Sequence, residues 1–165
     1  MSDAIDSALI EVTRELLDAC RKRQLKIATA ESCTGGLIAA CLTDISGSSD
    51  VFERGFVTYS NDAKHETLGV PLDVINADGA VSEAVARAMA EAALVRSRAD
   101  IAVSVTGVAG PNGGTEQKPV GLVYMATARR GAPTQAFKRN FEGDRRTVRW
   151  ATVAAALQAL AARVK

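Results

Sequence analysis

The sequence has few of the residues that build metal sites and disulfide frameworks. Its 165 residues include only three cysteines and one histidine, at Cys20, Cys33, Cys41 and His65. The cysteines are odd in number and lack Cys-x-x-Cys spacing, which argues against both a disulfide framework and a structural zinc site. We therefore expect no bound metal and a reducing compartment, so that the protein is cytoplasmic.

The sequence also has no long apolar run and no excess of charge. Twenty basic and nineteen acidic residues give a formal net charge of +1, which provides no field to attract nucleic acid or an acidic membrane. No apolar stretch approaches the roughly 18 residues of a membrane span, and the first residues lack the basic segment of a secretory signal. We expect a soluble protein that binds neither nucleic acid nor membrane.

Strand and helix patterns alternate along the chain. Helices are predicted where apolar residues recur at helical spacing or where a capping residue stands. Strands are predicted where runs of β-branched residues are bounded by glycine or proline. Helices are expected at 3–23, from 37, from 60 or 61, at 82–96 and from 144, and strands at 25–29, 51–59, 100–106, 120–128 and 135–141. The last two strands should pair as an antiparallel hairpin. We predict one domain, 1–165, of the α/β class: a three-layer α/β/α sandwich with a mixed sheet of about five to six strands.

The segment 30–36 is the first candidate for chemistry, because it joins a predicted buried strand to a predicted helix. It contains two candidate nucleophiles, Ser32 and Cys33, followed by Gly35 and Gly36. In open α/β sheets, ligands bind at the carboxyl ends of the strands, where the N–H groups of the following helix point outward. The two glycines would let a ligand approach the backbone, or would serve only the turn.

The choice between Ser32 and Cys33 stays open at this level. Neighbouring side chains at a strand end point in opposite directions, so only one of them faces the cleft. A thiol near a helix N-terminus is acidified and strongly nucleophilic, whereas a buried free cysteine acts as a small apolar residue.

A serine nucleophile needs a base, and Lys64 is the better candidate for it than His65. Lys64 lies in the first turn of a helix that Ser60 or Asn61 caps, where the helix dipole lowers the pKa of a lysine. The dipole alone cannot supply the downward shift of roughly 3 units that a base near neutrality needs, so Lys64 must also be partly buried. The alternative is a solvated surface lysine.

Two further segments are candidates for binding an anion. The loop 107–114 is rich in glycine but matches neither a Walker A motif nor a dinucleotide fingerprint. Its N–H groups could meet a phosphate or carbonyl beside the Thr106 hydroxyl, or the loop could be a plain connection. Arg145 lies in the first turn of the last helix, where a cation is mildly unfavourable, and this suggests an anion contact; the alternative is that Arg145 and Arg146 are simply solvated.

Several of these segments together resemble the CinA C-terminal domain family. The resemblance rests on 29–36 (TAESCTGG), 47–49 (GSS), 55–61 (GFVTYSN), Lys64, 79–82 (GAVS), 107–114 (GVAGPNGG), 118–121 (KPVG) and 143–145 (GDR). These motifs occur in the family's order and cover nearly the whole chain. The chain resembles the stand-alone form, without the additional N-terminal domain of longer members. This resemblance implies hydrolysis of the carboxamide of nicotinamide mononucleotide to nicotinate mononucleotide and ammonia, without a metal or cofactor.

The resemblance also implies roles for individual residues. Ser32 would be the nucleophile, Lys64 its base and Tyr59 the third member of the catalytic group, with Tyr59 or Lys64 protonating the leaving ammonia. N–H groups of the turn and loop would bind the oxyanion and the substrate phosphate, together with Thr106 and Arg145; the residues in question are Cys33, Thr34, Gly35, Gly36, Gly107, Gly110, Gly113 and Gly114. We expect a small-molecule mononucleotide substrate and a homo-oligomer. The alternative is a non-catalytic nucleotide-binding or competence-associated module.

Overall fold

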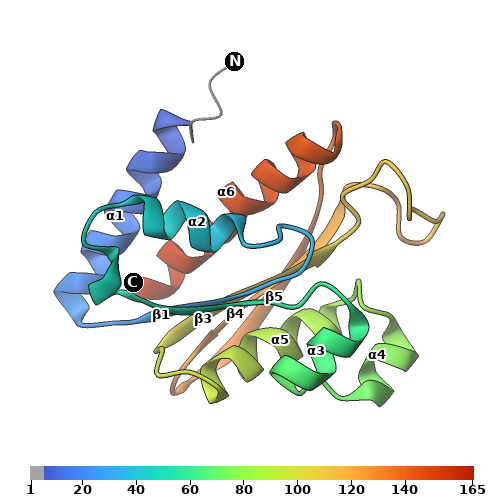
Figure 1. Cartoon of the computed structure of the whole chain (residues 1–165), viewed down its shortest axis with the longest axis horizontal. Coiled ribbons are helices and arrows are strands. Elements are labelled where there is room, and N and C mark those ends of the chain that lie inside the picture. The colour runs from blue at the N-terminus through green and yellow to red at the C-terminus, as the bar shows by residue number, and fades with distance from the viewer. Residues whose placement is uncertain (1–5) are drawn as a thin grey trace.

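The computed structural model describes residues 6–165, and in it a five-stranded sheet lies between two layers of helices (Figure 1). This confirms the predicted mixed sheet with helices on both faces. The elements are α1 (Ser7–Arg23), β1 (Ile27–Glu31), α2 (Leu37–Asp44), a 3-10 turn η1 (Ser48–Asp50), β2 (Phe52–Val57), α3 (Asn61–Leu68), α4 (Leu72–Asp78), α5 (Glu83–Val95), β3 (Ile101–Gly107), β4 (Leu122–Arg129), β5 (Ala132–Asn140) and α6 (Arg145–Val164).

The strands follow the order β2-β1-β3-β4-β5 across the sheet. β1 pairs in parallel with both β2 and β3, while β4 pairs antiparallel with β3 and with β5, as expected for a hairpin. Because β1, β2 and β3 are parallel, their carboxyl ends meet at one edge of the sheet. The turn after β1, the segment after β2 and the glycine-rich loop after β3 therefore lie together.

Each face of the sheet has its own apolar core. Helices α1, α2 and α6 cover one face, and α3, α4 and α5 cover the other (Figure 1). The second face is rich in alanine, with Ala28 and Ala30 of β1 packed in one cluster with Ala86, Ala90 and Ala93 of α5. Small side chains let α5 approach the sheet closely, so the layer that carries α3 is held near the strands.

The predicted helix caps are present. Ser60, Ser82 and Asp144 each accept a hydrogen bond from a backbone N–H in the first turn of α3, α5 and α6. Asp6 caps α1 in the same way. Residues 3–5 of the helix predicted at 3–23 lie outside the described residues.

Some boundaries differ from the predictions. β1 begins two residues later than expected, because Gln24 ends α1 in a left-handed conformation and the N–H of Lys26 donates to the Asp100 side chain. β2 ends at Val57 rather than Tyr59, and the predicted strand from 120 begins at Leu122. Helix α4 was not predicted; Pro71 precedes it without a side-chain cap, and Gly79 ends it.

Gly121 is the glycine whose replacement should damage the fold most. Its φ is +95°, and a Cβ there would overlap the backbone carbonyl of Phe141. Gly131 also has a positive φ, +75°, but has no atom within 4 Å of the position a Cβ would take. We expect Gly121→Ala to lower the free energy of unfolding by about 3 kcal/mol or more, and Gly131→Ala by about 1 kcal/mol. Urea unfolding of both variants measures this, and equal losses would contradict it.

Candidate active site

Ser32 directly follows β1, at the carboxyl edge of the sheet. Its N–H donates to the carbonyl of Val105 on β3, and its own carbonyl accepts from Gly35 at 3.0 Å, which closes a tight turn. Gly35 and Gly36 have φ of +60° and +101°, a region that other residues rarely adopt, so this turn itself needs glycine. The turn leaves the Ser32 side chain 8% exposed at the cleft.

Lys64 reaches the same point from the fourth position of α3. The side chain is only 1% exposed, and Nζ lies 2.9 Å from Ser32 Oγ. Nζ also donates to the carbonyls of Thr58 and Tyr59, at 3.0 and 3.2 Å. The surface-lysine alternative is therefore wrong. Burial lowers the pKa of Lys64, which favours the neutral amine that a base requires.

His65 faces away from this pair. Its Nδ1 lies 2.9 Å from the carbonyl of Val70, and it does not line the cleft. The basic side chain next to Ser32 is thus that of Lys64 and not that of His65.

Cys33 is an unfavourable nucleophile in this structure. Its side chain is buried, and this burial raises the pKa of the thiol to about 11, so the thiolate is scarce near neutral pH. The hypothesis of an acidified Cys33 thiol, which the sequence left open, is therefore wrong. The geometry favours Ser32, whose hydroxyl contacts a buried amine.

These residues line a cavity of about 270 Å³ at the carboxyl edge of the sheet. Most of the predicted site residues lie around it, together with several that were not predicted. The lining residues are Ser32, Cys33, Tyr59, Asn61, Lys64, Ala80, Val81, Thr106, Gly107, Val108, Ala109, Gly110, Asn112, Gly113 and Arg145. Thr34, Gly35, Gly36 and Gly114 are not among them.

Asn61 and Asn112 carry polar groups at this cavity that sequence reasoning missed. Both lie in segments that carry the family resemblance, 55–61 and 107–114, and this was the signal that could have found them. Ala80 and Val81 come from the segment between α4 and α5, whose motif 79–82 (GAVS) contributed to the family resemblance but was given no place in the predicted site.

The N-terminus of α2 is not open to a ligand, because Glu31 occupies it. The carboxylate of Glu31 is fully buried and accepts from the N–H groups of Gly36, Ile38 and Ala39 at 2.9–3.1 Å. It also accepts from the Thr34 hydroxyl at 2.6 Å. The helix end that would attract an anion thus already holds one from the chain itself. Of the N–H groups considered for the oxyanion, those of Gly35 and Gly36 are used internally, because they donate to the Ser32 carbonyl and the Glu31 carboxylate.

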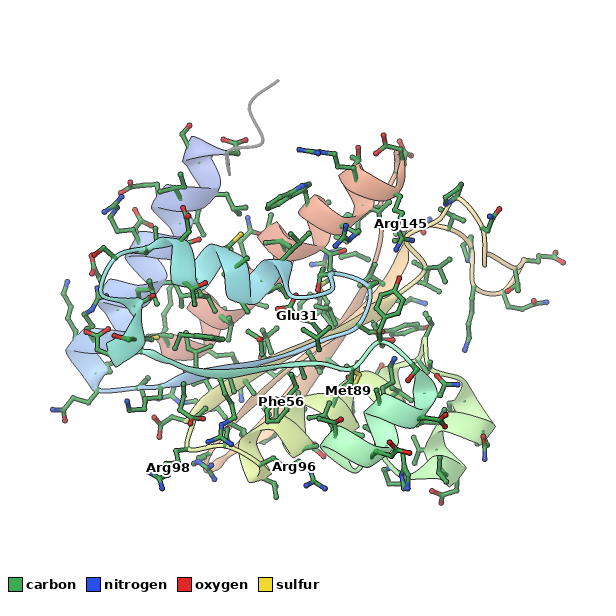
Figure 2. All side chains as sticks on the ribbon, viewed as in Figure 1. Glu31, Phe56, Met89, Arg96, Arg98 and Arg145 are labelled. Carbon is green, nitrogen blue, oxygen red and sulfur yellow. The ribbon has the colours of Figure 1, made fainter. Side chains whose placement is uncertain are left out.

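Arg145 and Tyr59 meet at the mouth of the cavity. Arg145 donates to the Tyr59 hydroxyl at 2.8 Å and to the carbonyl of Gly110 at 2.9 Å, so it joins the segment after β2 to the glycine-rich loop. Figure 2 shows Arg145 at the start of α6, above the edge where Glu31 ends β1. The Thr106 hydroxyl donates to the carbonyl of Ala80 and fixes the rear of the cavity.

Other features of the described residues do not compete with this site. A larger hollow of about 410 Å³ between α1 and α6 is lined by Leu9, Val12 and Trp150 and contains no nucleophile with a base. Among residues 6–165 no group of three His, Cys, Asp or Glu side chains is placed to hold a metal ion. No helix in that range is long and apolar enough to span a membrane.

The fold and the site together define an α/β protein with a buried serine–lysine pair at the carboxyl edge of a mixed sheet. The chain belongs to the CinA C-terminal domain family, whose profile matches residues 9–164.

The chain is similar to proteins of two different lengths. The chain is 48% identical, over 94% of both proteins, to a protein of Shigella flexneri named nicotinamide-nucleotide amidohydrolase PncC. It is also 48% identical to a putative competence-damage inducible protein of Caldicellulosiruptor bescii, of which it spans 37% of the length. The crystal structure of the competence/damage inducible protein CihA from Agrobacterium tumefaciens superposes with a TM-score of 0.94, at 48% identity and over 98% of each chain.

The buried amine of Lys64 should leave a signature in the pH dependence of stability. The pKa of Lys64 is lower in the folded protein than in the unfolded chain, so the folded state releases its proton first as the pH rises. Wild type should therefore gain stability relative to Lys64→Met by up to about 1.4 kcal/mol per pH unit, between the lowered pKa and about 10.4. Urea unfolding at several pH values measures this difference, with exposed Lys22→Met as the control for loss of one charge. A difference independent of pH would contradict the lowered pKa.

Proposed function

We propose that this chain hydrolyses the carboxamide of nicotinamide mononucleotide, releasing ammonia and nicotinate mononucleotide, with Ser32 as nucleophile and Lys64 as base. One observation carries the proposal: the buried Nζ of Lys64 lies 2.9 Å from Ser32 Oγ, in a cavity. The relatives named nicotinamide-nucleotide amidohydrolase PncC support the choice of substrate.

The first half of the reaction forms an ester on Ser32. Neutral Lys64 takes the hydroxyl proton while Oγ bonds to the carboxamide carbon, and the carbonyl oxygen becomes an oxyanion. When the tetrahedral intermediate collapses, the C–N bond breaks and the nitrogen leaves as ammonia with the proton from Lys64. Tyr59 is the second candidate donor of this proton.

The second half of the reaction restores Ser32. Lys64 takes a proton from water, whose oxygen bonds to the ester carbon, and the proton then passes to Ser32 Oγ as the ester bond breaks. Carboxamide and water become carboxylic acid and ammonia. The balance is complete with Ser32, Lys64 and water, and no step needs a metal or a cofactor.

The oxyanion and the phosphate need different partners. Cys33 lines the cavity directly after Ser32, so its N–H is the best placed of the proposed oxyanion donors. Arg145 and the N–H groups of the loop at Gly107, Gly110 and Gly113 would meet the phosphate at the opposite side of the cavity.

The competing proposal is a non-catalytic nucleotide-binding module. A binding module has no need for a lysine buried against a serine, because burying an amine is costly unless its lowered pKa is used. Release of ammonia from nicotinamide mononucleotide by the purified protein decides between the two, and binding without release would support the module.

Replacing each of the two neighbouring nucleophiles should separate their roles. Ser32→Ala removes the attacking oxygen, so we expect kcat for ammonia release to fall by at least about 10³-fold. Cys33→Ser keeps the backbone N–H and should stay within about tenfold of wild type. Steady-state kinetics of both variants measure this, and loss of activity only at Cys33 would reverse the assignment.

Lys64→Arg tests whether Lys64 is a base or only a positive charge. Arginine keeps the charge but does not give up its proton, so kcat should fall by at least about 10²-fold. In the wild type, kcat/KM should rise with pH through an ionisation below the usual lysine pKa of about 10.4, because burial favours the neutral amine. A near-normal kcat in Lys64→Arg, with the defect confined to KM, would exclude the serine–lysine mechanism.

A further inference from the structure

Arg149 contacts the turn that carries Ser32, although it lies near the other end of the sequence. It lies on α6, one helical turn after Arg145, and does not line the cavity. Its Nε donates to the carbonyl of Cys33 at 3.1 Å, and its Nη2 donates to the carbonyl of Thr34 at 2.9 Å. Arg149 is more than 110 positions away from Cys33 and Thr34 in the sequence, so only the fold brings it to them.

The turn is thereby held by two opposite charges. Glu31 binds N–H groups that follow the turn, at Gly36, Ile38 and Ala39, while Arg149 binds carbonyl groups within it. Arg149 also lies over Gly35, where a Cβ would meet Nη2 at 3.5 Å. Charge-assisted hydrogen bonds are roughly twice as strong as neutral ones, so the turn is restrained on both sides.

Arg149 affects the orientation of the Cys33 N–H through the Gly35 N–H. This Gly35 N–H belongs to the same peptide unit as the Thr34 carbonyl and donates to the Ser32 carbonyl. In a trans peptide the C=O and N–H point in opposite directions. The Ser32 carbonyl is turned toward the Gly35 N–H, which directs the Cys33 N–H away from the interior of the turn. Within residues 6–165 the Cys33 N–H makes no hydrogen bond to another residue, and Cys33 lines the cavity beside Ser32.

We propose that Arg149 is a positioning residue for the deamidation: it holds the Cys33 and Thr34 carbonyls so that Ser32 Oγ faces Lys64 and the Cys33 N–H faces the developing oxyanion. The inference rests on the function proposed above. Arg149 acts through the backbone and touches neither the substrate nor Lys64.

An arginine suits this role because its planar guanidinium carries several donors in fixed directions. Nε and Nη2 reach two successive carbonyls at once. A lysine at this position keeps the charge, but its three donors share one nitrogen and have no fixed planar arrangement, so it restrains at most part of the turn.

The test compares Arg149→Gln and Arg149→Lys with a matched control, Arg130→Gln. Arg130 donates to the carbonyls of Leu94, Ser97 and Ala99, near the start of β3, at the opposite edge of the sheet from Ser32. Arg130→Gln therefore removes an arginine that binds backbone carbonyls but does not contact the turn at Ser32. All variants are assayed for ammonia release from nicotinamide mononucleotide beside wild type and Ser32→Ala.

We expect Arg149→Gln to lower kcat by about 10²-fold with KM changed by less than about threefold, since a misplaced oxyanion donor costs transition-state stabilisation. Arg149→Lys should recover part of kcat, and Arg130→Gln should keep it whatever its Tm. The rising limb of the pH profile should not move, because Lys64 is unchanged. Hydrogen exchange at the N–H groups of Gly35 and Gly36 should speed up at least about tenfold in Arg149→Gln, less in Arg149→Lys, and not at all in Arg130→Gln.

Three results would overturn the inference. The first is a wild-type kcat in Arg149→Gln. If wild type then still releases ammonia and Ser32→Ala does not, the proposed function stands and only the positioning role is overturned. Unchanged exchange at Gly35 and Gly36 would overturn the positioning role independently of activity. Absence of ammonia release from wild type would overturn the proposed function and the positioning role with it.

Discussion

The site depends on the burial of one amine against a hydroxyl. Lys64 is 1% exposed, and within residues 6–165 its Nζ has only neutral oxygens as hydrogen-bond partners: Ser32 Oγ and the carbonyls of Thr58 and Tyr59. A buried amine must be hydrogen-bonded, and neutral acceptors do not hold its charge as a carboxylate would, so its pKa falls. The same bonds explain why β2 ends at Val57: the next two carbonyls bind the amine near the sheet edge. Helix α3 must then begin at once, and Ser60 caps it there.

A second constraint decides where negative charge is bound. The sequence places a glycine turn before a helix, an arrangement that often binds phosphate, but Glu31 already occupies the N-terminus of α2. A substrate phosphate there would meet a buried carboxylate. The cationic side of the cavity lies across from it, where Arg145 joins Tyr59 to the glycine-rich loop at Gly110. In the proposed reaction, this arrangement leaves the turn at Ser32 for the oxyanion and the Arg145 side for the phosphate.

Local signals predicted the scaffold well, and long-range contacts explain the failures. Ser60, Ser82 and Asp144 could be identified as caps because their role depends only on the next three residues. Helix α4 was missed, since it is only seven residues long and the residue at its N-cap, Pro71, provides no side-chain cap. Arg149 gave no signal beyond its spacing of four from Arg145, because its partners lie in a turn more than 110 residues earlier.

The sequence by itself determined the α/β class, the parallel strands with a final hairpin, and the segments that carry Ser32, Lys64 and Arg145, because hydrophobic period, caps and motif order are local properties. Only the tertiary structure decided between the alternatives that remained. Burial turned Lys64 from a surface lysine into a candidate base and made the Cys33 thiol a poor nucleophile, with a pKa of about 11. Burial and hydrogen-bond partners come from segments distant in the chain, and the pKa of each group depends on these surroundings rather than on its neighbours in sequence.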